Sequence, residues 1–464
     1  MAKQKRSAKK PAPAAAGFPK GFVWGCSAAS YQIEGGAHED GRGDSVWDMF
    51  CRKEGAVWSG HSGEVACDHY HRYKEDVALM KHIGLTAYRM SVAWPRVLPA
   101  GIGPVNAKGL AFYDRLVDEL LAAGIQPWIT LFHWDFPLAL YYRGGWLNRD
   151  SADWFADYAA IVVERLGDRV THWMTHNEPQ CTIGLGHLAG LHAPGDKLPT
   201  AEWLRAGHNL LRSHGKAVQA IRATSPSAAQ VGWAPVGHGM TPGTTSPRDI
   251  AAARKATLSV TTPDCWNATW WMDPVVFGRY PQDGLKLYGK AAPAASDEDM
   301  NTIRQPLDFM GLNIYHAHRV QAGPNGKPQV VPRPVGFPIT TYQWPITPEA
   351  IYWIPKFWQE RYKLPVVITE NGMANTECLS LDGQVHDPQR IDFLRRYLAE
   401  LRRGAAAGLD VRGYFQWSIL DNFEWHEGYK QRFGLVYVDY PTQRRILKDS
   451  ARWYKKVIAA NGAF

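Results

Sequence analysis

The chain has 464 residues, of which 45% are hydrophobic and 21% charged, and its formal net charge is +8. Six of the positive charges lie in residues 1–20, which contain no acidic residue, so the rest of the chain is almost electrically balanced. This balance argues against a nucleic-acid surface. No window of 18 uncharged apolar residues is present to span a bilayer. We therefore expect neither nucleic acid nor a membrane as a partner.

Residues 1–17 form a basic segment rich in alanine and proline, which predicts a disordered arm. The arm lacks the apolar stretch of a secretory signal. The six cysteines show no Cys-x-x-Cys spacing, so free thiols in a reducing compartment are expected. These features favour a cytoplasmic protein with one folded domain over residues 18–464, and leave open whether it forms a homo-oligomer.

Eight short apolar runs alternate with helical patterns along the chain. Buried strands that alternate with helices pair in parallel, and eight such units close into a (β/α)8 barrel with its reactive face at the carboxyl ends of the strands. An open doubly wound sheet is the alternative, but residues 25–30 do not form the glycine-rich nucleotide loop it needs. The predicted strands are Phe22–Cys26, Ala87–Val92, Gln126–Phe132, Val170–Thr175, Gln230–Ala234, Leu307–Asn313, Pro365–Thr369 and Arg412–Trp417.

Two of the predicted helices begin with a capping residue. Asn106 precedes an apolar stripe that ends at Gly124, and Asp387 is followed by Pro388 at the first helical position. Loop insertions are expected after several strands, including residues 176–200, 314–346 and 418–446. In a barrel these loops build a pocket.

Two glutamates stand at strand ends, Glu178 in Asn177-Glu178-Pro179 and Glu370 in Thr369-Glu370-Asn371. Parallel strands bring both side chains to the same rim. Hydrolysis of a glycosidic bond needs such a pair, one carboxyl group to protonate the leaving oxygen and another to attack or stabilise the anomeric carbon. The pair therefore predicts a glycosidase.

Polar and aromatic side chains converge on the same rim, as expected for a site that binds a sugar by its polar edges and apolar faces. His133 and Asp135 are also candidates for metal ligands, but no third ligand shares their spacing, so neither a metal nor another cofactor is expected. The converging residues are Gln32, Arg89, His133, Trp134, Asn313, Tyr315, Trp417, Glu424 and Trp425.

From about Phe18 to Tyr454 the chain resembles glycoside hydrolase family 1, the β-glucosidase family. The motifs that carry the resemblance occur in one order along the chain. They include residues 22–25, 30–35, 88–96, 133–135, 177–179, 192–195, 311–315, 369–372 and 417–425.

The resemblance implies a retaining β-glucosidase that acts through a covalent glycosyl-enzyme. Glu370 is then the nucleophile, Glu178 the acid/base, and Arg89 and Tyr315 keep Glu370 ionised and oriented. Asn177 is expected to bond the sugar 2-hydroxyl. The other implied substrate-binding residues are Gln32, His133, Glu424 and Trp425 at the 3-, 4- and 6-hydroxyls, Trp417 under the ring, Trp344 on the leaving-group side, and Trp134, Asn313 and Phe433.

These roles carry physical expectations. Arg89 should lower the pKa of Glu370, and the charge of Glu370 should raise the pKa of Glu178. Retention requires the two carboxyl groups to lie about 5–5.5 Å apart. Glu424 should repel a 6-phosphate, which favours unphosphorylated β-glucosides or cello-oligosaccharides, with β-galactosides and β-fucosides as side substrates. A transglycosylase using the same intermediate and a non-catalytic sugar-binding barrel are the alternatives.

Several conspicuous residues are expected to be structural. Trp24, Trp94 and Trp173 are interpreted as core residues, and His176 as a buried strand-end histidine. Glu34 is expected to accept hydrogen bonds that stabilise a loop.

Overall fold

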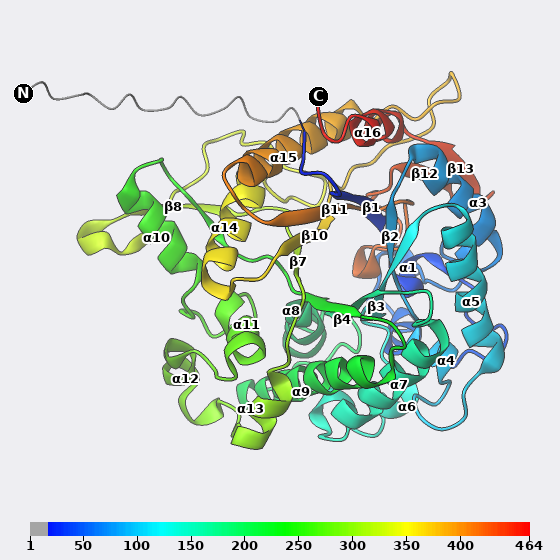
Figure 1. The fold of residues 1–464 in the computed structure, drawn as a ribbon, viewed down its shortest axis with the longest axis horizontal. Helices are drawn as coiled ribbons and strands as arrows, with labels where there is room; N and C mark the ends of the chain where they lie inside the picture. Colours follow the sequence, from blue (N-terminus) through cyan, green and yellow to red (C-terminus); the bar gives the residue numbers. More distant parts are fainter. Residues whose placement is uncertain (1–16) are drawn as a thin grey trace, which may run out of the picture.

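The computed structural model describes residues 17–464, and its centre is a barrel of eight parallel strands (Figure 1). Each strand pairs in parallel with its neighbour in the order β5-β4-β3-β2-β1-β11-β10-β7. The strands are β1 (Val23–Ser27), β2 (Ala87–Ser91), β3 (Gln126–Phe132), β4 (His172–Asn177), β5 (Gln230–Ala234), β7 (Met310–Asn313), β10 (Val366–Asn371) and β11 (Val411–Trp417).

Hydrogen bonds between β5 and β7 close the barrel. The amide of Asp308 donates to the carbonyl of Val231 (2.8 Å), and the amide of Gly237 donates to the carbonyl of Asn313 (2.8 Å). A parallel bridge between Val236 and Asn313 extends this contact toward the carboxyl ends of the two strands. The predicted (β/α)8 barrel is therefore confirmed.

All eight predicted strands occur, but β4 and β10 each run two residues further than expected. β4 continues to Asn177, so Glu178 is the first residue beyond it, and β10 continues to Asn371, so Glu370 lies inside the strand. Because a strand is held by its neighbours on both sides, this places the Glu370 backbone in the barrel wall.

The connecting helices form a layer around the barrel (Figure 1). They are α1 (Ser30–Ile33), α2 (Val46–Cys51), α3 (His69–Ile83), α4 (Trp94–Val97), α5 (Ala107–Ala122), α6 (Leu138–Tyr141), α7 (Ser151–Leu166), α8 (Pro179–Ile183), α9 (Thr200–Thr224), α10 (Pro247–Thr257), α11 (Ala268–Phe277), α12 (Gln282–Tyr288), α13 (Asp297–Ile303), α14 (Ala350–Tyr362), α15 (Pro388–Ala406) and α16 (Asp449–Ala459). Two small sheets lie outside the barrel, one of β6 (Met240–Pro242), β8 (His318–Ala322) and β9 (Pro328–Val330), the other of β12 (Val436–Asp439) and β13 (Arg444–Leu447).

The two predicted capping residues stand at the expected positions but do not cap with their side chains. The Asn106 amide donates to the carbonyls of Asp40 and Arg96, at 2.8 and 3.0 Å. The Asp387 carboxylate accepts from Arg390 and Ser450. In both cases the side chain bonds a residue distant in the sequence, Asp40 or Ser450, in place of a local cap.

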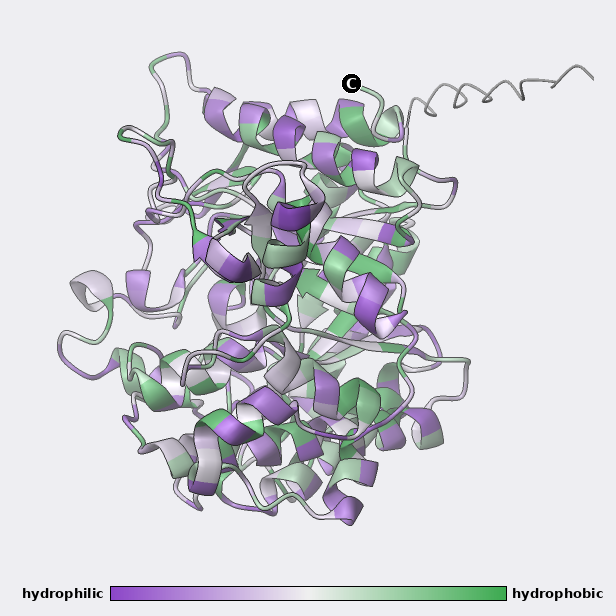
Figure 2. Cartoon of the chain, turned by 90° about the vertical axis from the view of Figure 1, so that its left-hand side faces the viewer, coloured by the Kyte–Doolittle hydropathy of each residue, from purple (hydrophilic) through white to green (hydrophobic). Residues whose placement is uncertain are grey.

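The interior of the barrel is packed rather than hollow. Figure 2 shows hydrophobic residues over the central strands, whereas the surrounding helices alternate hydrophobic and hydrophilic residues. A compact layer of buried side chains fills the end of the barrel opposite the rim glutamates, which gives any pocket at the rim a solid base. This layer consists of Ala87, Trp128, Met174, Ala234, Phe309, Val367 and Phe415.

The remaining structural expectations have clear outcomes. Trp24, Trp94 and Trp173 are buried in the core, and all six cysteines are unpaired. The predicted arm falls on residues 1–16, which lie outside the described residues, and on Gly17. Across residues 17–464, the helices are all too short or too polar to cross a bilayer.

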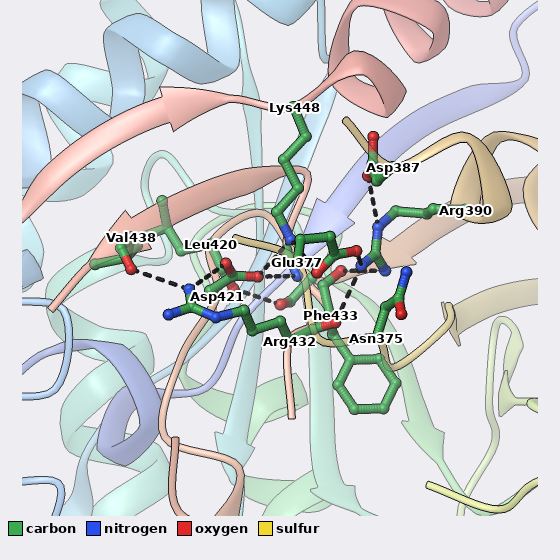
Figure 3. Close-up of polar contacts among 12 residues, drawn as sticks. Asn375, Glu377, Asp387, Arg390, Leu420, Asp421, Arg432, Phe433, Val438 and Lys448 are labelled. Carbon is green, nitrogen blue, oxygen red and sulfur yellow. Dashed lines mark hydrogen bonds and ion pairs between the residues drawn. The ribbon is translucent and has the colours of Figure 1, made fainter. Parts of the chain in front are cut away.

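A buried ionic network supports the wall behind β10 and β11 (Figure 3). Arg390 of α15 pairs with Asp387 (2.9 Å) and Glu377, and it also donates to the carbonyl of Phe433 (3.2 Å). Lys448 joins Glu377 to Asp421, at 3.1 and 2.8 Å. The network thus links α15, the chain that follows β11 and the start of α16.

We expect Arg390→Met to lower the free energy of unfolding by about 3–5 kcal/mol, because it leaves the buried carboxylates of Glu377 and Asp387 without their shared cation. The matched control is Arg396→Met on the same helix, whose pair with Asp392 is exposed and worth about 0.5 kcal/mol. Urea-induced unfolding followed by tryptophan fluorescence measures both. Equal losses for the two variants would contradict a stabilising role for the network.

Candidate active site

A cavity of about 490 Å³ opens at the carboxyl ends of the barrel strands. Eleven of the predicted site residues line it, and the other three, Gln32, Arg89 and Asn177, lie directly behind that lining in hydrogen-bond contact with it. The lining residues among those predicted are His133, Trp134, Glu178, Asn313, Tyr315, Trp344, Glu370, Trp417, Glu424, Trp425 and Phe433. The structure therefore brings all fourteen predicted residues together at one cavity.

Glu370 is held by a cation and a phenol. Arg89 of β2 donates to its Oε1 (2.5 Å), and the hydroxyl of Tyr315 donates to its Oε2 (2.7 Å). Burial raises the pKa of Glu370 above its ordinary value, while Arg89 and then Tyr315 lower it. Arg89 therefore lowers the pKa of Glu370 as expected, but burial outweighs the guanidinium and the net shift is upward. Arg89 nevertheless makes Glu370 the member of the glutamate pair that carries the negative charge.

Glu178 has a different environment. Its backbone lies in the left-handed region (φ 45°, ψ 72°), a conformation that costs a non-glycine residue about 1–3 kcal/mol and that turns the chain from β4 into α8. Its carboxyl group accepts from Asn313 Nδ2 and from the thiol of Cys181, both at 2.9 Å, and contacts no cation directly. Burial and then the charge of Glu370 raise its pKa to about 7, as the sequence predicted.

Asn177 links the two glutamates through its amide. Its Oδ1 accepts from Arg89 (2.6 Å) and from Asn313 (2.9 Å), and its Nδ2 lies 3.0 Å from His133 Nε2. The side chain is fully buried and held by three partners. One amide hydrogen of Asn177 remains for a ligand, because a primary amide has two.

Gln32 and Glu424 form the polar edge of the cavity away from the glutamate pair. The amide of Gln32 donates to Asn422 (3.0 Å), the carbonyl of Phe423 (2.9 Å) and Glu424 (3.4 Å). Its Oε1 is buried and has no hydrogen-bond partner among residues 17–464, so it can accept a ligand hydroxyl. Burial and then Glu370 and Glu178 raise the pKa of Glu424 to about 8.

Two groups of aromatic side chains line the cavity. In one group Trp134 and Trp425 lie 4.6 Å apart between ring centroids, and Trp417 lies 5.7 Å from His133. In the other group Tyr342 and Trp344 stack at 4.4 Å. Indole and phenol faces of this kind bind the apolar faces of sugar rings.

The sequence missed most of the outer lining. These residues lie outside the eight barrel strands, and the available signal was the expected insertions over residues 176–200, 314–346 and 418–446, which hold many of them. Gln180 is buried and contacts the lining through Val236 (3.1 Å). The missed residues are Cys181, Leu185, His192, Val236, Gly237, His238, Gly239, Trp266, His316, Ala317, His318, Tyr342 and His426.

The structural interpretations near the site are confirmed. His176 is buried against Ser213 (2.9 Å) and does not line the cavity. Glu34 accepts from Arg96 (2.9 Å) and Tyr113 (2.8 Å).

Between residues 17 and 464, no three His, Cys, Asp or Glu side chains gather in a geometry that could hold a metal ion.

Comparisons with known proteins agree with this geometry. Residues 14–463 match the profile of "Glycosyl hydrolase family 1". The chain is 46% identical over 446 residues to the 1,4-beta-D-glucan glucohydrolase of Thermotoga neapolitana, covering 96% of this chain and 99% of the relative, and 44% identical to beta-glucosidase A of Acetivibrio thermocellus with the same coverage. The structure of the Thermotoga maritima beta-glucosidase in complex with glucoimidazole is similar, with a TM-score of 0.88 and 45% identity over 97% of this chain and 100% of that one. The chain belongs to glycosyl hydrolase family 1.

Proposed function

We propose that the protein is a retaining β-glucosidase that removes terminal non-reducing β-D-glucosyl residues. The observation that carries the proposal is the asymmetry of two glutamates in one cavity. Glu370 is paired with Arg89, whereas Glu178 contacts no cation and has a pKa raised to about 7. One carboxyl group is thus anionic where the other keeps its proton, as double displacement requires.

In the first step Glu370 attacks the anomeric carbon while Glu178 gives its proton to the glycosidic oxygen, which breaks the bond to the leaving group. The product is a glucosyl ester of Glu370, which carries no negative charge. Because that charge raised the pKa of Glu178, the pKa then falls, and Glu178 takes a proton from the water that attacks the ester. Two inversions at the anomeric carbon give net retention.

Retention needs carboxyl groups about 5–5.5 Å apart. Contacts that join the two groups support such a spacing, since Asn313 donates to Glu178 and to Asn177 (2.9 Å each), and Arg89 links Asn177 to Glu370. Asn177 lies beside the partners of both carboxyl groups and is assigned to the sugar 2-hydroxyl. A hydrogen bond from its free amide hydrogen to that hydroxyl would stabilise the transition state more than the ground state.

The residues at the polar edge of the cavity favour glucosides that carry no 6-phosphate. Gln32, His133, Glu424 and Trp425 are assigned to the 3-, 4- and 6-hydroxyls, Trp417 to the face of the ring, and Trp344 to the leaving group. Lys430 pairs with Glu427 (2.7 Å) and is not among the residues that line the cavity. Phe433, which does line it, is apolar. No cation beside Glu424 in the described chain therefore neutralises a 6-phosphate.

β-Galactosides and β-fucosides are proposed as side substrates, because the carboxyl group of Glu424 can bond hydroxyls in either C4 configuration. A similar structure, the Thermotoga maritima beta-glucosidase in complex with galacto-hydroximolactam, supports this breadth (TM-score 0.88, 44% identity over 97% of this chain). Six unpaired cysteines support a reducing compartment such as the cytoplasm.

We expect Glu370→Gly to lose activity by on the order of 10⁴-fold or more, because the nucleophile is removed. Added azide should then attack from the vacated side and convert an aryl β-glucoside to the α-glucosyl azide, identified by proton NMR. Wild-type enzyme with azide is the control and should release β-glucose first. Formation of the β-azide by the variant would rule out Glu370 as the nucleophile.

Glu178→Ala should slow glucosides with poor leaving groups by about 10²–10⁴-fold. A 2,4-dinitrophenyl glucoside, whose leaving group needs no proton, should be cleaved in its first step at a rate close to that of the wild type. In the wild type, kcat/KM should fall as pH rises through about 7, because the proton-bearing form of Glu178 is lost. The variant should lack this alkaline limb. A loss that is equal for all leaving groups would contradict the acid role.

A panel of p-nitrophenyl glycosides tests substrate preference. We expect glucoside to be the best substrate, galactoside and fucoside to be turned over, and glucoside 6-phosphate to have a kcat/KM at least about 100-fold lower, because like charges would be juxtaposed near the buried carboxyls. Comparable turnover of the 6-phosphate would contradict the assignment of Glu424.

A further inference from the structure

The thiol of Cys181 makes a direct contact with the proposed acid/base. Cys181 lies in α8, three residues after Glu178, and one turn of helix brings its sulfur to 2.9 Å from Glu178 Oε2. The side chain is buried and lines the cavity. Across residues 17–464, this thiol is the protein hydrogen-bond partner of that oxygen.

The other oxygen of Glu178, Oε1, faces the side-chain amide of Asn313. The neighbours of Asn313 determine which of its two amide atoms points at Oε1. A guanidinium can only donate, so the atom of Asn177 that meets Arg89 (2.6 Å) must be its oxygen. The Asn313 atom that meets the same oxygen (2.9 Å) must then be its NH2 group.

That NH2 group also donates to Glu178 Oε1 at 2.9 Å, and Thr369 donates to the oxygen of Asn313 at 2.6 Å. Oε1 therefore always faces a donor and cannot hold the acid proton. The proton of the acid form must reside on Oε2, beside the sulfur of Cys181.

A thiol is both a weak donor and a weak acceptor, so it suits an oxygen that gains and loses a proton. We propose that Cys181 is a positioning residue whose thiol reverses its hydrogen bond with Glu178, accepting from the acid form and donating to the carboxylate. This inference rests on the proposed acid/base role of Glu178. Burial raises the pKa of the Cys181 thiol well above its ordinary value, so the sulfur keeps its own proton in both states.

The reversal fits both steps of the proposed reaction. In the acid form the proton of Oε2 lies against sulfur, a poor acceptor, and passes readily to the glycosidic oxygen as the C–O bond breaks. The thiol then turns and donates to the new carboxylate until that carboxylate takes a proton from water. Groups from other elements also face Glu178 and set its background field, namely Glu370 of β10, Arg89 of β2, Tyr315 after β7, Tyr342 in the following loop and Glu424 after β11.

The test compares Cys181→Val, which is close in size and cannot hydrogen-bond, with Cys181→Ser, which can donate and accept. Without the donor the carboxylate is less favoured, so in Cys181→Val the alkaline limb of kcat/KM should move to higher pH by about 0.3–1. The acid limb of kcat for 2,4-dinitrophenyl glucoside, where the second step is slow, should move the same way. Cys181→Ser should keep both limbs within about 0.2 of the wild type.

The matched control is Cys265→Val, since Cys265 is also a buried cysteine near α8 but does not contact Glu178. It should leave both limbs in place. A role in packing alone would lower the melting temperature of Cys181→Val without moving either limb, and that result would overturn the inference. So would a serine variant that shifts as far as the valine variant.

A second measurement does not depend on the folding of any one variant. The infrared S–H stretch of Cys181, identified as the band lost in Cys181→Ser or Cys181→Ala, should move to lower frequency as pH rises through the alkaline limb. A band that stays constant overturns the reversal. If the wild type shows no glucosidase activity, or if Glu178→Ala keeps the alkaline limb, the proposed function fails instead, and the two failures are thereby distinguished.

Discussion

The site depends on one buried guanidinium placed among three buried carboxyl groups. In the described chain, Arg89 is the cation that contacts this set, and it bonds Glu370 rather than Glu178 or Glu424. Three anions in so enclosed a space would repel one another strongly, and one cation offsets only one of them. The position of Arg89 in β2 therefore decides which carboxyl group is charged. The raised pKa values of Glu178 and Glu424, about 7 and 8, follow from the same arrangement.

Two glutamates that look alike in the sequence differ because the backbone presents them differently. Glu370 lies inside β10 and is held at both carboxylate oxygens by rigid neighbours. Glu178 lies one residue beyond β4 in a left-handed conformation, and α8 begins directly after it. This strained turn makes the helix contribute its own side chain, Cys181, to the carboxyl group. A nucleophile benefits from a single fixed position, whereas an acid/base needs a partner that tolerates two protonation states.

The sequence predicted the barrel and most of the inner site, because both depend on local patterns. Apolar runs identified all eight strands, and strand-end motifs together with the family resemblance identified fourteen residues that line or directly support the cavity. The sequence did not predict contacts between segments that are far apart along the chain. The sequence could not show that burial would raise the pKa of Glu370 by more than Arg89 lowers it. Nor could it show that the Asp387 side chain would bond Arg390 and Ser450 instead of capping α15. It also missed the outer wall, where His316 and Tyr342 come from loops without periodicity.

The division between inner and outer residues has a physical consequence for specificity. Inner residues project from strand ends that are bonded on both sides, and the ionic network of Arg390 and Lys448 holds the backbone of Phe433 behind them. The outer residues, among them His316 and Tyr342, lie outside the eight barrel strands. Substitutions among them can therefore change which leaving groups fit while the barrel keeps the reacting sugar, Glu178 and Glu370 in one geometry. Chemistry and aglycone choice are thus separable in this fold, because they are built on different elements.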